Sequence, residues 1–271
     1  MKRRAAVAGS FYPGREDALR NAIEKYVVDV QKEKTIAVLS PHAGYTYSGM
    51  VAGAVYSRVN ITGTVIILGP MHRYGGADFA LFPDGSWETP LGEVTIDKEF
   101  ADSIAANCPD IEKNTSAHDK EHSLEVQVPF LQYFKPEVKI VPVAIGTWQY
   151  DSLKKLGEGL AKSILEYGKD VLIVASSDMS HTESSNPALQ KKISDLDKQA
   201  LAKFAALDDK GFHDFITHRS ITMCGFAPAT VAIVAAKALS ATSGELVDYR
   251  TSYDVTGDYS YVVGYAGVII R

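Results

Sequence analysis

The sequence has little that would suit a disulfide-stabilised, membrane-embedded or nucleic-acid-binding protein. Only two of its 271 residues are cysteines, Cys108 and Cys224, too few for a disulfide framework, which favours a reducing compartment. Its longest apolar stretches, residues 226–239 and 261–270, are shorter than the roughly 20 residues that a membrane-spanning helix needs. With 28 basic against 33 acidic side chains the net charge is -5, and no long basic run occurs. We therefore expect a cytoplasmic protein that binds neither membranes nor nucleic acids.

The motifs of several common catalytic and binding sites are also missing. The sequence contains neither the G-x-x-x-x-G-K-[ST] loop nor the G-x-G-x-x-G loop that cradle nucleotide phosphates. It lacks the G-x-S-x-G turn of many serine hydrolases. Two distant cysteines cannot provide C-x-x-C zinc spacing. These absences disfavour a nucleotide-binding enzyme, a serine hydrolase and a zinc finger.

The sequence contains a regular alternation of short β-branched runs and longer segments with a helical pattern. Its composition is 46% hydrophobic, which is sufficient for a substantial core. The short β-branched runs that predict strands are residues 35–39, 64–68, 138–145, 171–175, 245–251 and 261–270. The segments with a helical pattern are residues 16–30, 123–134, 151–167, 187–206 and 226–239. Residues 77–96, with a turn at residues 83–85, predict a hairpin.

Strands separated by helices require crossover connections and therefore predict a mostly parallel sheet. Runs such as VIIL and VLIV have no polar alternation, as expected for strands that are covered on both faces. We expect a single α/β domain over residues 1–271, with three layers in which helices flank a mostly parallel central sheet.

Three predicted strands are each followed by a histidine. His42 follows the strand at 35–39, His72 follows the strand at 64–68, and His181 follows the strand at 171–175. Ligands of open α/β sheets bind beyond the carboxyl ends of the strands, where all three histidines meet if the strands are parallel. A single histidine in such a loop more often satisfies a backbone group, but three together indicate a site.

Other reactive side chains are weaker candidates. His118 and His122 have the i, i+4 spacing of many metal ligands. We expect His118 to lie at a solvated helix start, whereas for His122 a role in the site and a position on the surface both stay open. His213 is expected on the surface. Cys224 directly precedes a predicted helix, whose N-terminal N–H groups would lower the pKa of its thiol, although a buried and inert cysteine is the commoner outcome.

Six motifs in order resemble the Memo family (mediator of ErbB2-driven cell motility), including its bacterial and archaeal members. They are residues 7–13 (VAGSFYP), 40–45 (SPHAGY), 69–72 (GPMH), 121–125 (EHSLE), 177–181 (SDMSH) and 223–225 (MCG). The resemblance runs from residue 5 to the last predicted strand. More distantly, this family resembles the class III extradiol dioxygenases, which use non-haem iron(II) in the same kind of α/β fold.

The resemblance implies roles for individual residues. His42, His72 and Cys224 match pocket residues that look like a metal site for iron or copper, with zinc less favoured. His181, with Asp178, matches the place where the dioxygenase relatives keep an acid/base histidine. His122 matches a further pocket histidine of those relatives, which implies a catalytic role for it beside His181 and Asp178.

One departure from the dioxygenases bears on the chemistry, since they hold iron with two histidines and a carboxylate, whereas the third residue here is the thiol of Cys224. A thiolate is softer, accepts copper(I) as well as iron, and is itself oxidisable. The leading interpretation is a metal-dependent oxidoreductase acting on an unidentified small molecule, with His181 moving protons and Asp178 fixing its tautomer.

Two alternatives remain open. One is a non-enzymatic adaptor that binds a peptide or phosphopeptide on an enzyme fold, as the animal members of the resembled family suggest. The other is a zinc-dependent hydrolase, since zinc accepts two histidines and a cysteine with a fourth position open. The resemblance further implies a radical SAM enzyme as partner.

Overall fold

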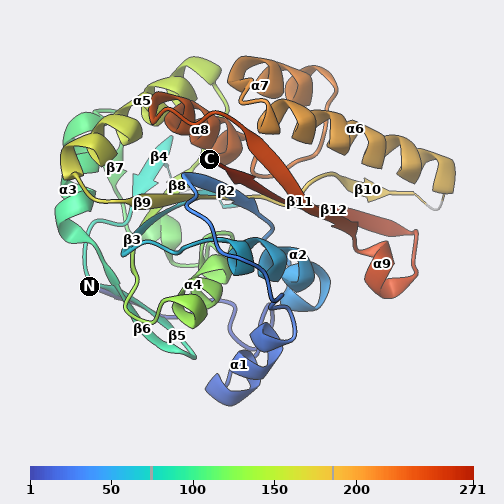
Figure 1. Cartoon of the computed structure of the whole chain (residues 1–271), viewed down its shortest axis with the longest axis horizontal. Helices are drawn as coiled ribbons and strands as arrows, with labels where there is room; N and C mark the ends of the chain where they lie inside the picture. The colour runs from blue at the N-terminus through green and yellow to red at the C-terminus, as the bar shows by residue number, and fades with distance from the viewer. Residues whose placement is uncertain (74–75, 185) are drawn as a thin grey trace.

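A computed structural model describes residues 1–73, 76–184 and 186–271, in which one mixed sheet is covered by helices on both faces (Figure 1). The strands described are β1 (Lys2–Arg3), β2 (Ala37–Ser40), β3 (Thr64–Pro70), β4 (Phe79–Leu81), β5 (Ser86–Thr89), β6 (Gly92–Ile96), β7 (Glu112–Lys113), β8 (Lys139–Ile145), β9 (Val171–Ser176), β10 (His181–Glu183), β11 (Gly244–Thr251) and β12 (Tyr261–Ile270). The main path runs β1-β5-β6-β8-β3-β9-β2-β12-β10, with β11 beside β12 and β4 beside β8. The central neighbours β6, β8, β3, β9 and β2 are parallel, which confirms the predicted mostly parallel sheet.

The helices include all five that the sequence pattern predicts. Those described are α1 (Glu16–Glu24), α2 (Tyr45–Arg58), α3 (Lys98–Asn107), α4 (Val128–Phe134), α5 (Tyr150–Tyr167), α6 (Pro187–Ala205), α7 (Asp209–His218), α8 (Phe226–Ala238) and α9 (Tyr253–Thr256), with 3-10 turns η1 (Ser116–His118) and η2 (Glu125–Gln127). Two boundaries differ from the prediction. Helix α1 ends at Glu24 rather than at residue 30, and α4 begins at Val128 because residues 125–127 form the tighter η2 turn.

The core is divided by the sheet into two layers. Successive side chains of a strand point to opposite faces, so Val38 and Leu39 of β2 enter different apolar clusters. Helices α1, α2 and α4 cover the face that carries Val38, and α3, α5, α6, α7 and α8 cover the face that carries Leu39 (Figure 1). Each fully buried aliphatic side chain contributes roughly 1.5–3 kcal/mol. The predicted three-layer arrangement is therefore found.

Helix α2 was not predicted, because its sequence lacks a clear apolar stripe and contains two glycines, which disfavour helix interiors. The structure explains one of them. A Cβ atom at Gly53 would lie 2.2 Å from the carbonyl oxygen of Tyr26, so the close approach of the chain after α1 requires glycine there. Tertiary packing thus overrides a weak local preference.

The predicted hairpin at residues 77–96 is only partly correct. Strands β5 and β6 form an antiparallel hairpin, but its turn follows Thr89 rather than lying at residues 83–85. Strand β4 instead pairs with β8. The turn at Gly85, which has φ of +97°, redirects the chain from one part of the sheet to another.

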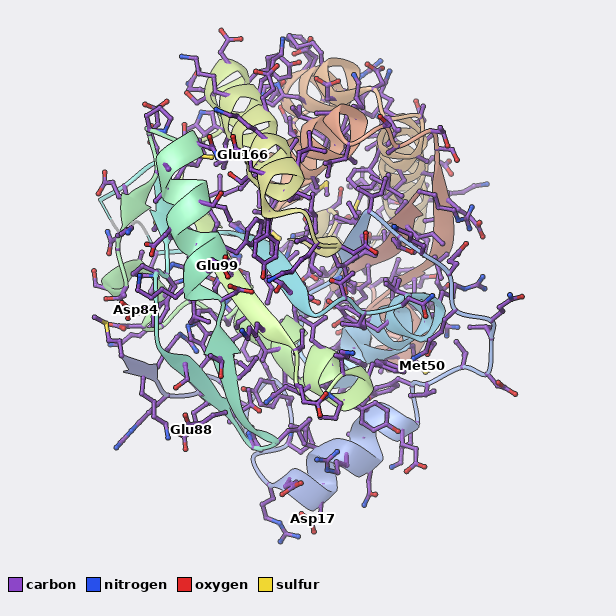
Figure 2. All side chains as sticks on the ribbon, turned by 60° about the vertical axis from the view of Figure 1, so that its left-hand side comes forward. Asp17, Met50, Asp84, Glu88, Glu99 and Glu166 are labelled. Carbon is purple, nitrogen blue, oxygen red and sulfur yellow. The ribbon has the colours of Figure 1, made fainter. Side chains whose placement is uncertain are left out.

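The outer surface carries the charged side chains that the helices turn away from the core. Figure 2 labels Asp17 on α1, Glu99 on α3 and Glu166 on α5, and all three are exposed. Among the described residues, no helix combines the length and the apolar character needed to cross a membrane.

Candidate metal centre

Three histidines converge beyond the carboxyl ends of neighbouring parallel strands. Strand β9 lies between β3 and β2; His42 follows β2 and His72 follows β3. The third, His122, comes from the segment that precedes η2. One ring nitrogen of each histidine can be chosen so that all three lie within 4.8 Å of one another. The ring centroids of His72 and His122 are 4.5 Å apart, and that of His42 is 5.3 Å and 5.5 Å from them.

His42 is the most deeply buried of the three, with 2% of its surface exposed. Its backbone N–H donates to Asp178 Oδ1 at 2.8 Å, and its Nδ1 lies 3.0 Å from the hydroxyl oxygen of Ser176. Burial lowers the pKa of His42 well below its usual value, and the nearby imidazoles of His72 and His122 act in the same direction. The ring is therefore neutral near pH 7, the form that binds metals.

His72 is oriented by the carboxylate of Glu121. The backbone N–H of His72 donates to Glu121 Oε2 at 2.7 Å, and its Nδ1 lies 2.9 Å from Oε1. Although burial opposes ionisation, hydrogen bonds from His72 and Ser123 lower the pKa of Glu121 to about 2. Because an ionised carboxylate only accepts, the Nδ1 atom of His72 carries a proton, and in the neutral ring the Nε2 atom keeps a free lone pair.

His122 reaches the centre, and His118 does not. The two do not share a helical face, because η1 ends at His118 and the chain turns before His122. The ring of Phe11 packs against His122 with a centroid distance of 4.7 Å. Burial lowers the pKa of His122 below its usual value. The prediction from the i, i+4 spacing, that both side chains lie on one helical face, is therefore wrong.

Two histidines that were expected on the solvated surface are buried. His118 is fully buried, with Nε2 3.0 Å from the carbonyl oxygen of Ala80, and His213 is buried on α7, with Nε2 2.8 Å from the carbonyl oxygen of Trp148. Both predictions were wrong, because each imidazole satisfies a backbone carbonyl inside the fold.

Cys224 touches the histidine cluster from the start of α8. Its Sγ atom lies 3.1 Å from Nε2 of His42 and 3.6 Å from the carbonyl oxygen of Asp178. The predicted lowering of its pKa is not found. Burial raises the pKa of the thiol, and the Asp178 carboxyl group adds to this. The N–H group of Gly225 is already used, because it donates to the Ser177 hydroxyl at 2.8 Å.

The position of Cys224 depends on the absence of a side chain at residue 225. A Cβ atom at Gly225 would lie 2.3 Å from the carbonyl oxygen of Ser176, at the rigid end of β9. We expect Gly225→Ala to lower the free energy of unfolding by about 1–3 kcal/mol, because the start of α8 must move away. Urea titration measures this, with Gly63→Ala as control, since a Cβ at Gly63 meets no described atom within 4 Å. Equal losses in both variants would contradict this packing argument.

His181 lies at the start of β10 and is not part of the three-histidine group, and it is oriented differently from the prediction. Its Nδ1 atom is 3.1 Å from the carbonyl oxygen of Thr222, which only accepts, so this nitrogen carries the proton. Asp178, predicted to fix this tautomer, instead accepts hydrogen bonds from the backbone N–H groups of His42 and Ala43. Burial raises the pKa of Asp178 above its usual value. Asp178 therefore anchors the loop that carries His42.

Two polar residues of the centre were missed from the sequence. Glu121 holds His72, and Ser176 contacts His42. A signal for the first was present, since a carboxylate next to a candidate ligand is a common outer partner of metal-bound histidines. A serine at the end of a buried strand gives no comparable signal.

Comparison with known proteins matches nearly the whole chain to one family. A family model described as Memo-like protein matches residues 3–269. A MEMO1 family protein of Methanopyrus kandleri is 39% identical, covering 100% of this chain and 99% of that protein. A MEMO1 family protein of Aquifex aeolicus is 41% identical over 98% of each chain. The crystal structure of an uncharacterized protein from Escherichia coli K12 is similar in fold, with a TM-score of 0.55 at 10% identity, covering 88% of this chain and 100% of that one.

Proposed function

The chain belongs to the family of Memo-like proteins. We propose that it is a metal-dependent oxidoreductase of the non-haem iron or copper type. His42, His72 and Cys224 are the proposed ligands, and His122 joins them as a further donor. The observation that carries the proposal is the convergence of three imidazoles within 4.8 Å, with the thiol of Cys224 3.1 Å from one of them.

The donor set fits a transition metal. Imidazole nitrogen suits iron, copper and zinc, and a thiolate adds preference for copper(I) and iron. The hydrogen bond from His72 Nδ1 to Glu121 leaves Nε2 as the ligand atom, the usual outer-shell arrangement for a metal-bound histidine. A bound metal would supply redox and Lewis-acid chemistry.

The chain's own residues then have separate tasks. Cys224 loses its thiol proton on ligation, since the thiolate is the ligand form. The Thr222 carbonyl holds the Nδ1 proton of His181, so Nε2 of His181 is free to accept a proton from a substrate. Asp178 keeps the His42 loop in place through two backbone hydrogen bonds. His181 is therefore proposed as the acid/base residue, and Asp178 as the anchor of the loop that carries His42.

The test is metal content and oxygen consumption after anaerobic loading with Fe²⁺ or Cu⁺. We expect about one equivalent of one of these ions in the wild-type protein, oxygen uptake on exposure to air with a reductant, and weaker Cu⁺ binding in Cys224→Ser because the soft ligand is removed. Cys108→Ser is the matched control, since Cys108 is a buried thiol at the end of α3. Wild-type protein that stays metal-free after both loadings would overturn the proposal.

A zinc-dependent hydrolase is the second candidate, and the position of His122 favours it. Three histidines with an open fourth position form a known catalytic zinc site, in which the metal lowers the pKa of bound water. Zinc at unit occupancy, ester or amide hydrolysis and no oxygen uptake would select this alternative. Oxygen uptake with iron or copper would exclude it.

A further inference from the structure

Behind His42 lies a buried chain of hydrogen bonds that leads away from the metal centre. The hydroxyl group of Tyr56 donates to Gln127 Oε1 at 2.7 Å, Gln127 Nε2 donates to the Ser176 hydroxyl at 2.7 Å, and Ser176 Oγ lies 3.0 Å from Nδ1 of His42. None of the four residues is more than 2% exposed. Buried polar groups are hydrogen-bonded in the great majority of cases, so the direction of each hydrogen bond in this enclosed chain can be derived from its partners.

The orientation of the Gln127 amide is set by a backbone carbonyl. The nitrogen atom Nε2 lies 2.9 Å from the carbonyl oxygen of Pro41, which can only accept. If the amide were reversed, two oxygen atoms would face each other there, and Tyr56 would lose its acceptor. The N–H₂ group of Gln127 therefore gives one hydrogen to Pro41 and the other to Ser176.

The direction of the Ser176 hydroxyl follows in the same way. Its Oγ atom lies 2.6 Å from the carbonyl oxygen of Ser123, which has no hydrogen to give. The single hydroxyl proton of Ser176 must lie in that contact, because otherwise two oxygen lone pairs would face each other at 2.6 Å. Ser176 therefore donates to Ser123 and accepts from Gln127, which leaves one lone pair for His42.

Only one tautomer of His42 completes this chain. With the hydroxyl proton already committed, Ser176 can only accept from the ring, so Nδ1 of His42 carries the hydrogen and Nε2 keeps its lone pair. That lone pair is on the side of Cys224, whose Sγ atom is 3.1 Å away. We propose that Ser176, fixed by Ser123 and Gln127, is a positioning residue that locks His42 as the Nδ1–H tautomer and so presents Nε2 to the metal.

His72 and His181 do not need such a chain of hydrogen bonds, whereas His42 does. His72 donates to a carboxylate and His181 to a carbonyl oxygen. Neither of these partners has a hydrogen to donate, so each fixes the tautomer of its imidazole directly. A serine hydroxyl can donate or accept, so by itself it would leave the tautomer of His42 undefined. The Ser123 carbonyl and the Gln127 amide remove that ambiguity. In the tautomers proposed for His42, His72 and His181, Nε2 then carries no hydrogen.

The functional role of this tautomer rests on the proposed metal centre, but the tautomer itself can be tested without a metal. In metal-free wild-type protein labelled with [¹⁵N]histidine, we expect two-bond proton–nitrogen correlations to show that the hydrogen of His42 is on Nδ1. The His42 signals are identified by their loss in His42→Gln. A hydrogen on Nε2 of His42 would overturn the inference whether or not the protein binds metal.

The second test measures Co²⁺ affinity and has a matched control in the sheet. Ser40 and Ser176 are paired across β2 and β9, and both are fully buried. Among the described residues the Ser40 hydroxyl interacts with the Tyr56 hydroxyl at the far end of the chain of hydrogen bonds and makes no hydrogen bond to Ser176 or His42. We expect Ser176→Ala to weaken Co²⁺ binding by about 10–100-fold, the usual loss for an outer-shell partner. Ser40→Ala should leave the affinity unchanged, and Ser176→Thr, which keeps the hydroxyl, should restore most of it.

These outcomes separate the inference from the metal proposal. Equal Co²⁺ affinity in Ser176→Ala and Ser40→Ala would overturn the positioning role, provided that wild-type protein binds the ion. Wild-type protein that binds no transition metal would overturn the proposed function, while the tautomer measured in the metal-free protein would still decide the role of Ser176. Thermal unfolding of the two alanine variants shows whether a loss of affinity follows from a loss of folding. In the case that Ser176→Ala does not fold, the tautomer measured in the wild-type protein decides the role of Ser176.

Discussion

Replacing His42 by alanine is expected to weaken the binding of Co²⁺ by more than about 100-fold. Loss of an outer-shell partner alone costs about 10–100-fold, and this substitution removes a proposed ligand. His42 is central because its ring is next to both other imidazoles and its Nε2 atom is 3.1 Å from the Cys224 sulfur. The affinity is measured from the visible absorption of Co²⁺ during titration.

The matched control for this substitution is His218→Ala, which removes an exposed histidine from the end of α7. It should bind Co²⁺ as the wild-type protein does. The backbone hydrogen bond from residue 42 to Asp178 survives in His42→Ala, so the loop should keep its position. If His42→Ala and His218→Ala bound the ion equally well, the proposed centre would not be the binding site.

Replacing Arg3 by methionine is expected to lower the free energy of unfolding by about 3–5 kcal/mol, the largest stability effect that we predict. The Arg3 guanidinium forms an ion pair with Glu125 at 2.7 Å, and both side chains are at most 2% exposed. Removing one member of a buried pair leaves the other charge uncompensated. Arg3 also lies 4.3 Å from the Trp87 ring centre and donates to the carbonyl oxygens of His118 and Glu121.

Urea denaturation measures this effect, with Arg15→Met as control. Arg15 pairs with Asp17 on the surface, with 79% of its side chain exposed, and such pairs contribute about 0–1 kcal/mol. The double variant Arg3→Met/Glu125→Leu should recover part of the loss, since both charges of the pair are then removed. Recovery will be incomplete, because Glu125 also accepts hydrogen bonds from Tyr12 and from the backbone of residues 6 and 7. Equal effects of Arg3→Met and Arg15→Met would contradict this role of the buried pair.

The ion pair between Arg3 and Glu125 also holds in place a segment that contributes to the metal centre. It ties the N-terminal segment to residues 118–125, the stretch that contains both Glu121 and His122. The motifs at residues 7–13 and 121–125 were recognised separately in the sequence. The structure shows that Glu125 accepts hydrogen bonds from the backbone N–H groups of Val7, the first residue of the first motif, and of Ala6 just before it. Two motifs far apart in the chain therefore form one polar unit.

The sequence by itself determined the α/β class, the mostly parallel sheet and the delivery of His42 and His72 to one sheet edge. These features follow from local patterns. Buried strands read as continuous apolar runs, helices repeat every 3.6 residues, and the residue after a parallel strand lies at the carboxyl edge. The family resemblance, which rests on six such local motifs, is confirmed by a match over residues 3–269.

Only the tertiary structure decided which of His118 and His122 joins the centre, whether Cys224 is held as a neutral thiol, and which group fixes each imidazole. Burial, hydrogen-bond direction and pKa depend on partners that come from distant segments. Ser176 meets His42 across 134 residues of sequence, and the same serine contacts Ser123 from a third segment. Local spacing carries no information on such contacts, because they exist only once the strands have paired and the loops have been packed against one another.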